Sequence, residues 1–455
     1  MSIVGPDHVR TDEVSRNAYG VDALQRGRPA DVVVIPGVTA EVADIARACD
    51  QAAVPLTPRG AGTGYTGGAV PVCGGVVLSL ERLNRIIDID TSSLVAVVEP
   101  NVVTADLQAA VERVGLFYPP DPASLSQSVI GGNVAECAGG PRAFKYGTTK
   151  RYVLGLEAVL PSGEVIRTGG KSVKNVVGYD VTQLLVGSEG TLAIVTQIIV
   201  RLVPLPPARA TLRASFTSIA RAIEAVGAVI AEGVVPAALE LIDADCVRAI
   251  ERQRGGDTSA GSDVVLLIEV DGMPASVREE LQRVRHACAA VGGAVATAET
   301  EEERDALWRD RRDLSLALRA LAPRKINHDV VVPKGRIQQL FDVIAGLKDT
   351  YRLPMPSFGH VGDGNIHVNI LVDPADADAM TRASKAERQL FEEVVALEGS
   401  ISGEHGVGFS KAPFLGLELS TETIALMRRL KHAFDPNGIL NPGKIFPQTD
   451  DSSRN

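Results

Sequence analysis

The glycine-rich stretch at residues 55–70, PLTPRGAGTGYTGGAV, constrains the fold of this chain more than any other part of the sequence. Three of its glycines match G-x-G-x-x-G, a pattern that opens a helix in Rossmann folds, with the N-terminus of that helix facing a pyrophosphate. Here Pro71 and the pair Gly74-Gly75 follow the pattern closely, and the next run, VVLSL, is typical of a strand. The sequence therefore argues against a dinucleotide-binding Rossmann fold.

The same stretch retains the composition of an anion-binding loop. Closely spaced glycines expose backbone N–H groups and leave no Cβ to block a phosphate, and Arg59 adds a positive charge. A glycine-rich hairpin without a ligand is the alternative, but five glycines within nine residues exceed what a turn requires. These glycines are Gly60, Gly62, Gly64, Gly67 and Gly68.

Secondary-structure patterns divide the chain into three parts. Residues 1–205 alternate strand-like runs with amphipathic helical patterns, such as the one beginning at Thr39, and predict a mixed α and β domain. The proline-rich run VPLPP, which starts at Val203, marks the next boundary. Residues 206–408 carry strand candidates separated by charged helices and predict an α+β domain with an antiparallel sheet and helices on one face. Residues 409–455 are too few for a further domain.

Composition and charge exclude several classes of function. The net charge of -10 and the absence of a basic stripe argue against a nucleic-acid partner. Five scattered cysteines without a C-x-x-C pair indicate reduced thiols and a cytoplasmic protein. The N-terminus lacks the apolar region of a signal peptide, and no apolar run reaches the ~18 residues of a membrane span. Peripheral contact with a membrane remains open.

Two histidine motifs, FGHVGDGNIHVNI and ISGEHGVGFSK, suggest a metal site. Strand alternation in IHVNILV places His367 and Asn369 on one face, and the preceding turn lets His360 fold back toward it. Two imidazoles and a carboxylate, here Glu404, leave open coordination positions as catalytic Zn²⁺ sites do, while His405 would face a substrate. The alternative is a set of separate loop residues with ordinary hydrogen bonds, but two such motifs in one domain favour the metal.

The helical run LWRDRRDLSLAL offers a cation for an acidic substrate. Arg311 and Ser315 lie one turn apart, so both side chains can reach one ligand, and a guanidinium binds a carboxylate bidentately. The alternative is a solvated charged face, because Arg309 and Arg312 belong to the same run.

Several stretches resemble the FAD domains of the vanillyl-alcohol oxidase/p-cresol methylhydroxylase family, over about residues 30–205. They are PRGAGTGYTGGAVP, YPPDPAS, SVIGGNVAECAGGPRAFKYGTT and KNVVGYDVTQLLVGSEGTLAIVT. The resemblance implies a PCMH-type FAD-binding domain of two subdomains, with a C-terminal residue returning to the flavin. It implies FAD contacts at Pro58, Arg59, Gly60, Ala61, Gly62, Thr63, Gly64, Gly67, Gly68, Pro120, Asp121, Ser124, Ser128, Gly131, Gly132, Asn133, Gly139, Gly140, Tyr146, Gly147, Glu189, Gly190, Ile194 and Asn441. Covalent-flavin relatives often carry histidine near the position of Thr63, so non-covalent FAD is implied.

The two histidine motifs resemble the metal site of FAD-linked 2-hydroxy-acid dehydrogenases, a group that includes D-lactate dehydrogenases and the FAD subunit of bacterial glycolate oxidase. The resemblance implies metal ligands at His360, His367 and Glu404 and a catalytic base at His405. It favours Arg311 as the cation for the substrate carboxylate, because Arg311 follows Trp308 in the pattern Trp-x-x-Arg. It also places Asn369 beside the substrate. Ser315 and Lys325 are further candidates for substrate contacts.

The expected activity is FAD-dependent oxidation of a small 2-hydroxy acid, such as D-lactate or glycolate, to the 2-keto acid by hydride transfer to flavin N5. A divalent metal, with Zn²⁺ the expected ion, would assist. The electron acceptor could be a quinone, a cytochrome, a partner subunit or oxygen, and a homo-oligomer is left open. Two alternatives remain: a metal-free alcohol oxidase of the same fold, and a flavoprotein subunit of an electron-transfer complex that is inactive alone.

Overall fold

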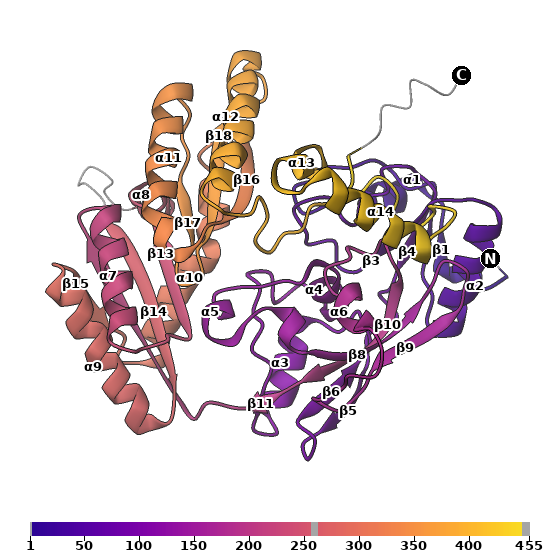
Figure 1. Ribbon diagram of the computed structural model, residues 1–455, viewed down its shortest axis with the longest axis horizontal. Coiled ribbons are helices and arrows are strands. Elements are labelled where there is room, and N and C mark those ends of the chain that lie inside the picture. Colours follow the sequence, from indigo (N-terminus) through magenta and orange to yellow (C-terminus); the bar gives the residue numbers. More distant parts are fainter. Residues whose placement is uncertain (1, 256–262, 448–455) are drawn as a thin grey trace. The chain divides into compact units, whose positions relative to one another are not determined.

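The computed structural model describes residues 2–255 and 263–447 and groups the chain into two compact units (Figure 1). Unit 1 consists of Met1–Gly139, Thr148–Leu205 and Glu404–Asn455, and unit 2 consists of Gly140–Gly147 and Pro206–Gly403. The chain therefore passes between the units at the proline-rich run and also on either side of residues 140–147 and at the Gly403–Glu404 peptide bond. The composition of the sequence predicts only the first of these connections between the units, the proline-rich run.

A four-stranded sheet forms the first part of unit 1, in the order β1-β2-β4-β3. Its strands are β1 (Val9–Arg10), β2 (Val32–Val34), β4 (Val76–Ser79) and β3 (Leu56–Arg59). Strands β2, β4 and β3 are parallel, and α2 (Thr39–Gln51) buries an apolar side against this sheet's core. The glycine-rich stretch leaves β3 and enters β4 without forming a helix, so the prediction that it does not begin a Rossmann helix is confirmed.

A five-stranded antiparallel sheet forms the second part of unit 1, in the order β5-β6-β10-β8-β9. Its strands are β5 (Ile86–Asp90), β6 (Val95–Val98), β10 (Ile194–Arg201), β8 (Val153–Val159) and β9 (Val165–Gly169). Helices α3 (Thr104–Glu112) and α4 (Ile130–Glu136) precede β8 in the chain. The two sheets give unit 1 the two subdomains that the sequence predicts.

The C-terminal segment is built into unit 1. After α14 (Thr421–Phe434) the chain pairs with β3, where the Leu56 N–H donates to the Ile439 carbonyl at 2.8 Å and the Asn441 N–H donates to the Leu56 carbonyl at 2.8 Å. Ile439 and Leu440 are buried in the same apolar cluster as Leu56. Residues more than 380 positions apart in the sequence thus share one core.

Unit 2 contains a seven-stranded sheet in the order β15-β12-β14-β13-β17-β18-β16. Its strands are β15 (Ala294–Thr297), β12 (Ala208–Phe216), β14 (Val264–Gly272), β13 (Ala238–Ile242), β17 (Ser357–His360), β18 (Asn365–Val372) and β16 (Arg324–Val331). Every neighbouring pair is antiparallel, which confirms the predicted antiparallel sheet.

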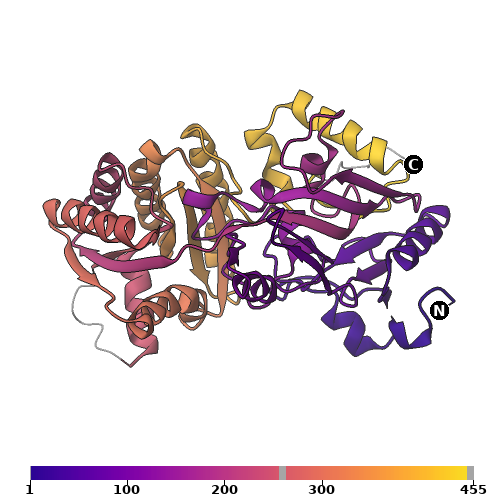
Figure 2. The same ribbon diagram turned by 90° about the horizontal axis from the view of Figure 1, so that it is seen from below.

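Helices cover both faces of the unit 2 sheet, so the expectation of helices on one face is wrong (Figure 2). One face carries α7 (Ile219–Ala231), α9 (Pro274–Ala290), α11 (Ile337–Tyr351) and α12 (Ala377–Ala396), and the other carries α8 (Ala244–Gln253) and α10 (Glu301–Arg319). The physical reason is that the second face holds buried carboxylates. Helix α10 supplies their partners, with Arg311 bonded to Glu240 and Trp308 to Glu269.

Two expectations drawn from composition can be compared with the structure. Among the described residues, no helix has both the length and the apolar character needed to cross a membrane. All five cysteines lie in described parts of the chain, and none of them forms a disulfide.

Candidate functional site

The glycine-rich loop in unit 1 is held mainly by close packing. A Cβ on Gly60 would lie 2.6 Å from a methyl group of Val129, and a Cβ on Gly67 would overlap the ring of Phe409. Gly67 also has a φ of 84°, in the left-handed region that favours glycine. Gly64 differs, because among the described residues, apart from its own chain neighbours, no atom lies within 4 Å of the place its Cβ would take. Packing thus explains two of these glycines, whereas Gly64 borders open space that a ligand could use.

Arg59, at the end of β3, lies beside this loop with its side chain turned inward. Its Nη1 donates a hydrogen bond to the Val21 carbonyl at 2.9 Å, and its guanidinium stacks over the Tyr19 ring at 5.9 Å. Burial lowers the pKa of this guanidinium. The arrangement keeps a positive charge next to the loop, and no carboxylate of the described residues forms an ion pair with it.

The C-terminal tail closes on the same loop. The Asn441 side chain donates hydrogen bonds to the Gly68 carbonyl at 2.9 Å and to the Glu189 carbonyl at 2.8 Å. Lys444 donates to the Val70 carbonyl at 2.6 Å and to the Asn441 side chain at 2.9 Å. The structure therefore brings together three predicted FAD-site positions that lie far apart in the sequence. Lys444 was not predicted, although it stands only three residues after the predicted Asn441.

Other predicted FAD-site residues bond to the protein itself. The Asn133 side chain donates to the Thr104 hydroxyl at 2.8 Å, and this hydroxyl lies 2.9 Å from that of Ser128. Tyr146 belongs to unit 2, where its hydroxyl donates to Asp271 at 2.6 Å. These bonds give the three residues structural contacts, and their roles as FAD contacts stay predictions. Gly140 and Gly147 also belong to unit 2, and the remaining predicted residues are in unit 1.

Within unit 1 the glycine-rich loop holds the segment that contains His405. The Thr66 hydroxyl donates to the His405 carbonyl at 2.9 Å, and the Tyr65 ring meets the imidazole edge-on with centroids 5.0 Å apart. The Glu189 carboxylate accepts from the backbone N–H groups of Val407 at 2.7 Å and Gly408 at 2.6 Å. The sequence did not predict Tyr65 and Thr66 as site residues, even though they stand inside the recognised loop.

Glu136 is a second residue that the sequence did not predict. Its Oε2 atom is shielded from solvent and has no hydrogen-bond partner among the described residues. Burial, together with the nearby Glu189 carboxylate, raises the pKa of Glu136 well above its ordinary value. The cause of the shift is the removal of this carboxyl group from solvent beside a second carboxylate.

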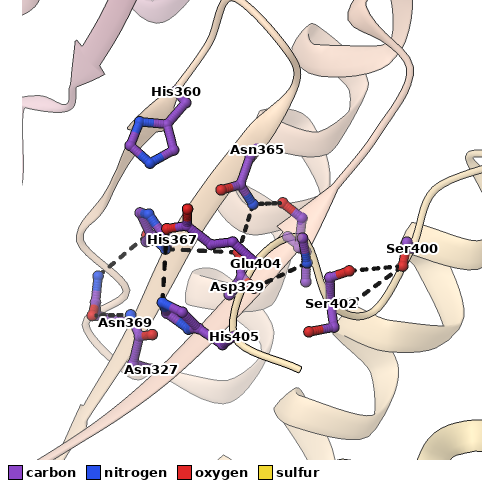
Figure 3. A network of polar contacts seen from close by, with 12 residues as sticks. Asn327, Asp329, His360, Asn365, His367, Asn369, Ser400, Ser402, Glu404 and His405 are labelled. Atoms are coloured by element: carbon purple, nitrogen blue, oxygen red, sulfur yellow. Dashed lines mark hydrogen bonds and ion pairs between the residues drawn. The ribbon is translucent and has the colours of Figure 1, made fainter. Parts of the chain in front are cut away.

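In unit 2, polar side chains meet on the sheet face that α10 covers (Figure 3). The pairing of β17 with β18 brings the His360 and His367 rings to a centroid distance of 5.3 Å. The pairing of β16 with β18 sets Asp329 opposite His367 and Asn327 opposite Asn369, whose side chains are hydrogen-bonded at 2.8 Å. The predicted alternation, with His367 and Asn369 on one face, therefore describes β18 correctly.

Residues with side chains that can bind a metal lie near the end of unit 2. The Gly403 N–H donates to the Asp329 carboxylate at 2.9 Å, and Glu404 is the next residue of the chain. Within unit 2, the imidazoles of His360 and His367 and the carboxylate of Asp329 are donors of the types that bind divalent ions. The sequence predicts His360, His367 and Glu404 as the ligands, and two imidazoles with one carboxylate suit an ion such as Zn²⁺. This ligand set stays a prediction.

Arg311 is the buried member of its charged run. It is 5% exposed, whereas Arg309 and Arg312 are exposed, so the alternative of a solvated face does not describe Arg311. Its guanidinium lies over the Phe358 ring at 4.5 Å. An arginine buried on the same sheet face as the histidines suits the binding of a carboxylate.

Lys325 and Ser315 form a further pair on this face. The ammonium of Lys325, on β16, donates to the Ser315 hydroxyl of α10 at 2.5 Å. Burial, with the nearby charge of Arg319, lowers the pKa of Lys325 to about 8. The structure thus connects two residues that the sequence suggested separately as substrate contacts.

Glu240 is the functional residue that the sequence missed in unit 2. It is 0% exposed on β13, and its carboxylate accepts from His360 Nδ1 at 2.5 Å and from Arg311 Nε at 2.6 Å. Burial alone would raise the pKa of Glu240, but the charge of Arg311 and the hydrogen bonds with His360 and Arg311 outweigh it and lower the pKa to about 2. A glutamate inside the apolar run AALELI was the available signal.

Comparison with known proteins follows the same division of the chain. Residues 30–169 match a family model described as "FAD binding domain", and residues 205–445 match one described as "FAD linked oxidases, C-terminal domain". Glycolate oxidase subunit GlcD of Bacillus subtilis is 43% identical, over 98% of this chain and 95% of its own length. A probable mitochondrial D-lactate dehydrogenase of Danio rerio is 34% identical, over 98% of this chain and 91% of its own length.

The fold has a solved counterpart in p-cresol methylhydroxylase with bound substrate. The match covers 98% of this chain and 95% of the p-cresol methylhydroxylase chain, with a TM-score of 0.80 and 17% sequence identity. This similarity supports the PCMH-type fold. The second family model covers more than half of the chain, each of the two relatives covers 98% of it, and all agree in type. The chain therefore belongs to the FAD-linked oxidase family and is an FAD-dependent oxidoreductase.

Proposed function

We propose that this protein oxidises a small 2-hydroxy acid to the corresponding 2-keto acid, using non-covalent FAD and a divalent metal, with Zn²⁺ the expected ion. The observation that carries the proposal is the buried sheet face that combines Arg311, Lys325, His360 and His367. A carboxylate needs cations, and a neighbouring hydroxyl needs a polarising group and a base. The names of the two relatives, a glycolate oxidase subunit and a D-lactate dehydrogenase, support the same class of substrate.

The cationic side chains bind the substrate carboxylate. The Arg311 guanidinium donates to Glu240 through its Nε, and its two terminal nitrogens are the further donors that a substrate carboxylate would use. Lys325 adds a second charge, and Ser315 and Asn369 supply hydroxyl and amide groups on the same face. Such an arrangement selects for an acid and holds its Cα in place.

The hydroxyl proton passes to His405. His360, His367 and Glu404 would hold the metal ion, which, when bound, lowers the pKa of a hydroxyl group that it contacts. His405 accepts the proton as a general base, and the Tyr65 ring and the Thr66 hydroxyl keep its segment in place. FAD, when bound, supplies the acceptor for the hydride that leaves Cα.

Unit 1 would bind FAD without a covalent bond. Thr63 stands near the place where covalent-flavin relatives carry histidine, and a threonine cannot form the histidyl link. The open space beside Gly64, the charge of Arg59 and the closing contacts of Asn441 support a dinucleotide at this loop. We place the protein in the cytoplasm because its cysteines are unpaired.

A second candidate is a flavoprotein subunit that passes electrons to partner subunits and is inactive alone. The Bacillus subtilis relative is named as a subunit of glycolate oxidase, which favours this candidate. In either case, a quinone, a cytochrome or a partner subunit would take the electrons from reduced FAD.

The experiment is anaerobic mixing of the FAD-loaded protein with D-lactate, L-lactate, glycolate and D-2-hydroxyglutarate, followed by flavin absorbance. Bleaching by one of these acids, with the 2-keto acid formed in equal amount, is the expected result. Bleaching only after a cell fraction has been added would favour the subunit. Bleaching by an uncharged alcohol but by none of the acids would contradict the proposal.

A further inference from the structure

We infer that Glu240 is a positioning residue that orients His360 toward the metal and Arg311 toward the substrate at the same time. The inference rests on the proposed function. It concerns a residue of β13, a strand that contributes none of the predicted ligands or substrate contacts. Its basis is a pair of contacts that one buried carboxylate makes with two different elements.

The two oxygens of Glu240 have separate partners. Oε1 lies 2.5 Å from His360 Nδ1, at the end of β17, and Oε2 lies 2.6 Å from Arg311 Nε, on α10. Glu240 is 0% exposed, and His360 and Arg311 are 4% and 5% exposed. A buried carboxylate with these two contacts connects the ligand strand to the substrate helix.

The contact with His360 determines which ring nitrogen carries hydrogen. A carboxylate paired with an arginine can only accept hydrogen bonds, so Nδ1 of His360 must be the donor. Nε2 then keeps its lone pair and is the nitrogen that can bind a metal. Carboxylates behind ligating histidines hold ring orientation in this way in many metal sites, and their loss commonly costs ~10–100-fold in metal affinity.

The contact with Arg311 completes a clamp on its guanidinium. Arg311 lies over the Phe358 ring at 4.5 Å, and Phe358 belongs to the same strand as His360. The pairing Leu241↔Gly359 between β13 and β17 places Glu240 on the face that carries His360. Strand register therefore fixes the Glu240 carboxylate and the Phe358 ring relative to one another, and their two contacts with Arg311 hold the guanidinium of α10 between them.

Glu240→Gln tests this arrangement with almost no change of shape. Its amide has one oxygen and one NH₂, so it can satisfy only one of the two partners. An amide oxygen that faces Arg311 turns the NH₂ toward His360 Nδ1, which must then accept, so the ring hydrogen moves to Nε2 and blocks the ligand atom. In the opposite orientation the NH₂ faces the Arg311 Nε–H, so two hydrogen-bond donors face each other and the bond to Arg311 is lost.

Glu269→Gln is the matched control. Glu269 lies on the adjacent strand β14, is 4% exposed, and accepts from the Thr211 hydroxyl at 2.9 Å and Trp308 Nε1 at 2.8 Å. It has the same chemistry and a similar degree of burial, but its partners are neither metal ligands nor substrate contacts. An effect of removing any buried charge from this face would appear in both variants.

The experiment uses the full chain loaded with FAD and stripped of metal, and titrates Zn²⁺ against a chromophoric chelator. E240Q should bind Zn²⁺ about 10–100-fold more weakly than wild type and should raise the KM for the 2-hydroxy acid more than it lowers kcat. FAD content should stay at one per chain, and E269Q should bind Zn²⁺ as wild type does. In a background of His360→Gln, E240Q should have no further effect on Zn²⁺ affinity, because it acts through that ring.

Zn²⁺ affinity of E240Q within twofold of wild type, or an equal loss in E269Q, would overturn the inference alone. A wild-type protein that binds no Zn²⁺ would overturn the proposed metal site and the inference with it. If E240Q does not fold, Glu240→Asp keeps the charge but is too short to reach both partners. It should then weaken Zn²⁺ binding at least about threefold, and unchanged affinity in E240D would be equally decisive against the inference.

Discussion

The glycine-rich loop of unit 1 and the polar sheet face of unit 2 are two kinds of site. The loop is continuous in sequence, and its backbone is held by packing and by a hydrogen bond from Asn441, while its own Thr66 hydroxyl donates to the His405 carbonyl. The sheet face is discontinuous, and its side chains come from β13, β16, β17, β18 and α10. A site of the first kind is recognisable from a motif, whereas a site of the second kind depends on strand register.

The largest effect is expected at the proposed base, His405. His405→Ala should keep FAD bound, because the Thr66 contact is made with the backbone carbonyl, and should slow flavin reduction by the 2-hydroxy acid about 10²–10⁴-fold. Stopped-flow absorbance under anaerobic conditions measures the rate. Reduction at the wild-type rate would remove His405 from the mechanism.

Arg311→Met should affect unit 2 and spare unit 1. The change leaves the buried Glu240 carboxylate without its strongest partner, so the free energy of unfolding of unit 2 should fall by about 3–5 kcal/mol. The affinity for a 2-hydroxy acid should fall as well. Chemical denaturation and FAD content are the measurements, and Arg312→Met is the exposed control. Loss of FAD with an unchanged unit 2 would reverse the assignment of the two sites.

Two glycine variants separate packing from ligand binding in the loop. Gly67→Ala should destabilise unit 1 by about 1–3 kcal/mol, because φ is 84° and the added methyl group overlaps Phe409. Gly64→Ala should leave stability unchanged and weaken FAD binding if the cofactor occupies the open space there. Thermal melting of the apoprotein measures the stability of each variant, and FAD titration measures its affinity for the cofactor. Equal effects of both variants on stability would show that the open space has no special role.

The smallest expected effect is a pH dependence of substrate binding. Lys325 has a pKa lowered to about 8, so its positive charge is present below that pH and is lost as the pH rises through it. The KM for an acid substrate should therefore rise above about pH 8, by up to about tenfold per pH unit, with a smaller change in kcat. Lys325→Arg should flatten the profile, because arginine stays charged. A rise of equal size in that variant would assign the titration to another group.

The sequence predicts local features of both sites well. Alternation in IHVNILV places His367 and Asn369 on one face, and Pro71 with the Gly74-Gly75 pair excludes a helix after the loop, as the structure shows. The choice of Arg311 within its charged run agrees with its burial. Each of these features depends on residues close together in the chain.

What the sequence could not supply depends on pairings between distant strands. Glu240 meets His360 only because β13 pairs with β17 across 120 residues, and no local pattern encodes that register. The helices on the second sheet face have the same origin, because α10 is drawn there by the buried Glu240 and Glu269. The open position at Gly64 likewise depends on which neighbours reach the loop.

The most direct test of the division between the two sites uses one FAD-loaded preparation, with and without metal. The protein is mixed anaerobically with the 2-hydroxy acid that bleaches it, before and after removal of metal by a chelator, with metal content checked by elemental analysis. We expect the metal-free protein to keep its FAD and its fold but to lose bleaching, and added Zn²⁺ to restore it. Bleaching at an unchanged rate in verified metal-free protein would contradict the proposed role of His360, His367 and Glu404.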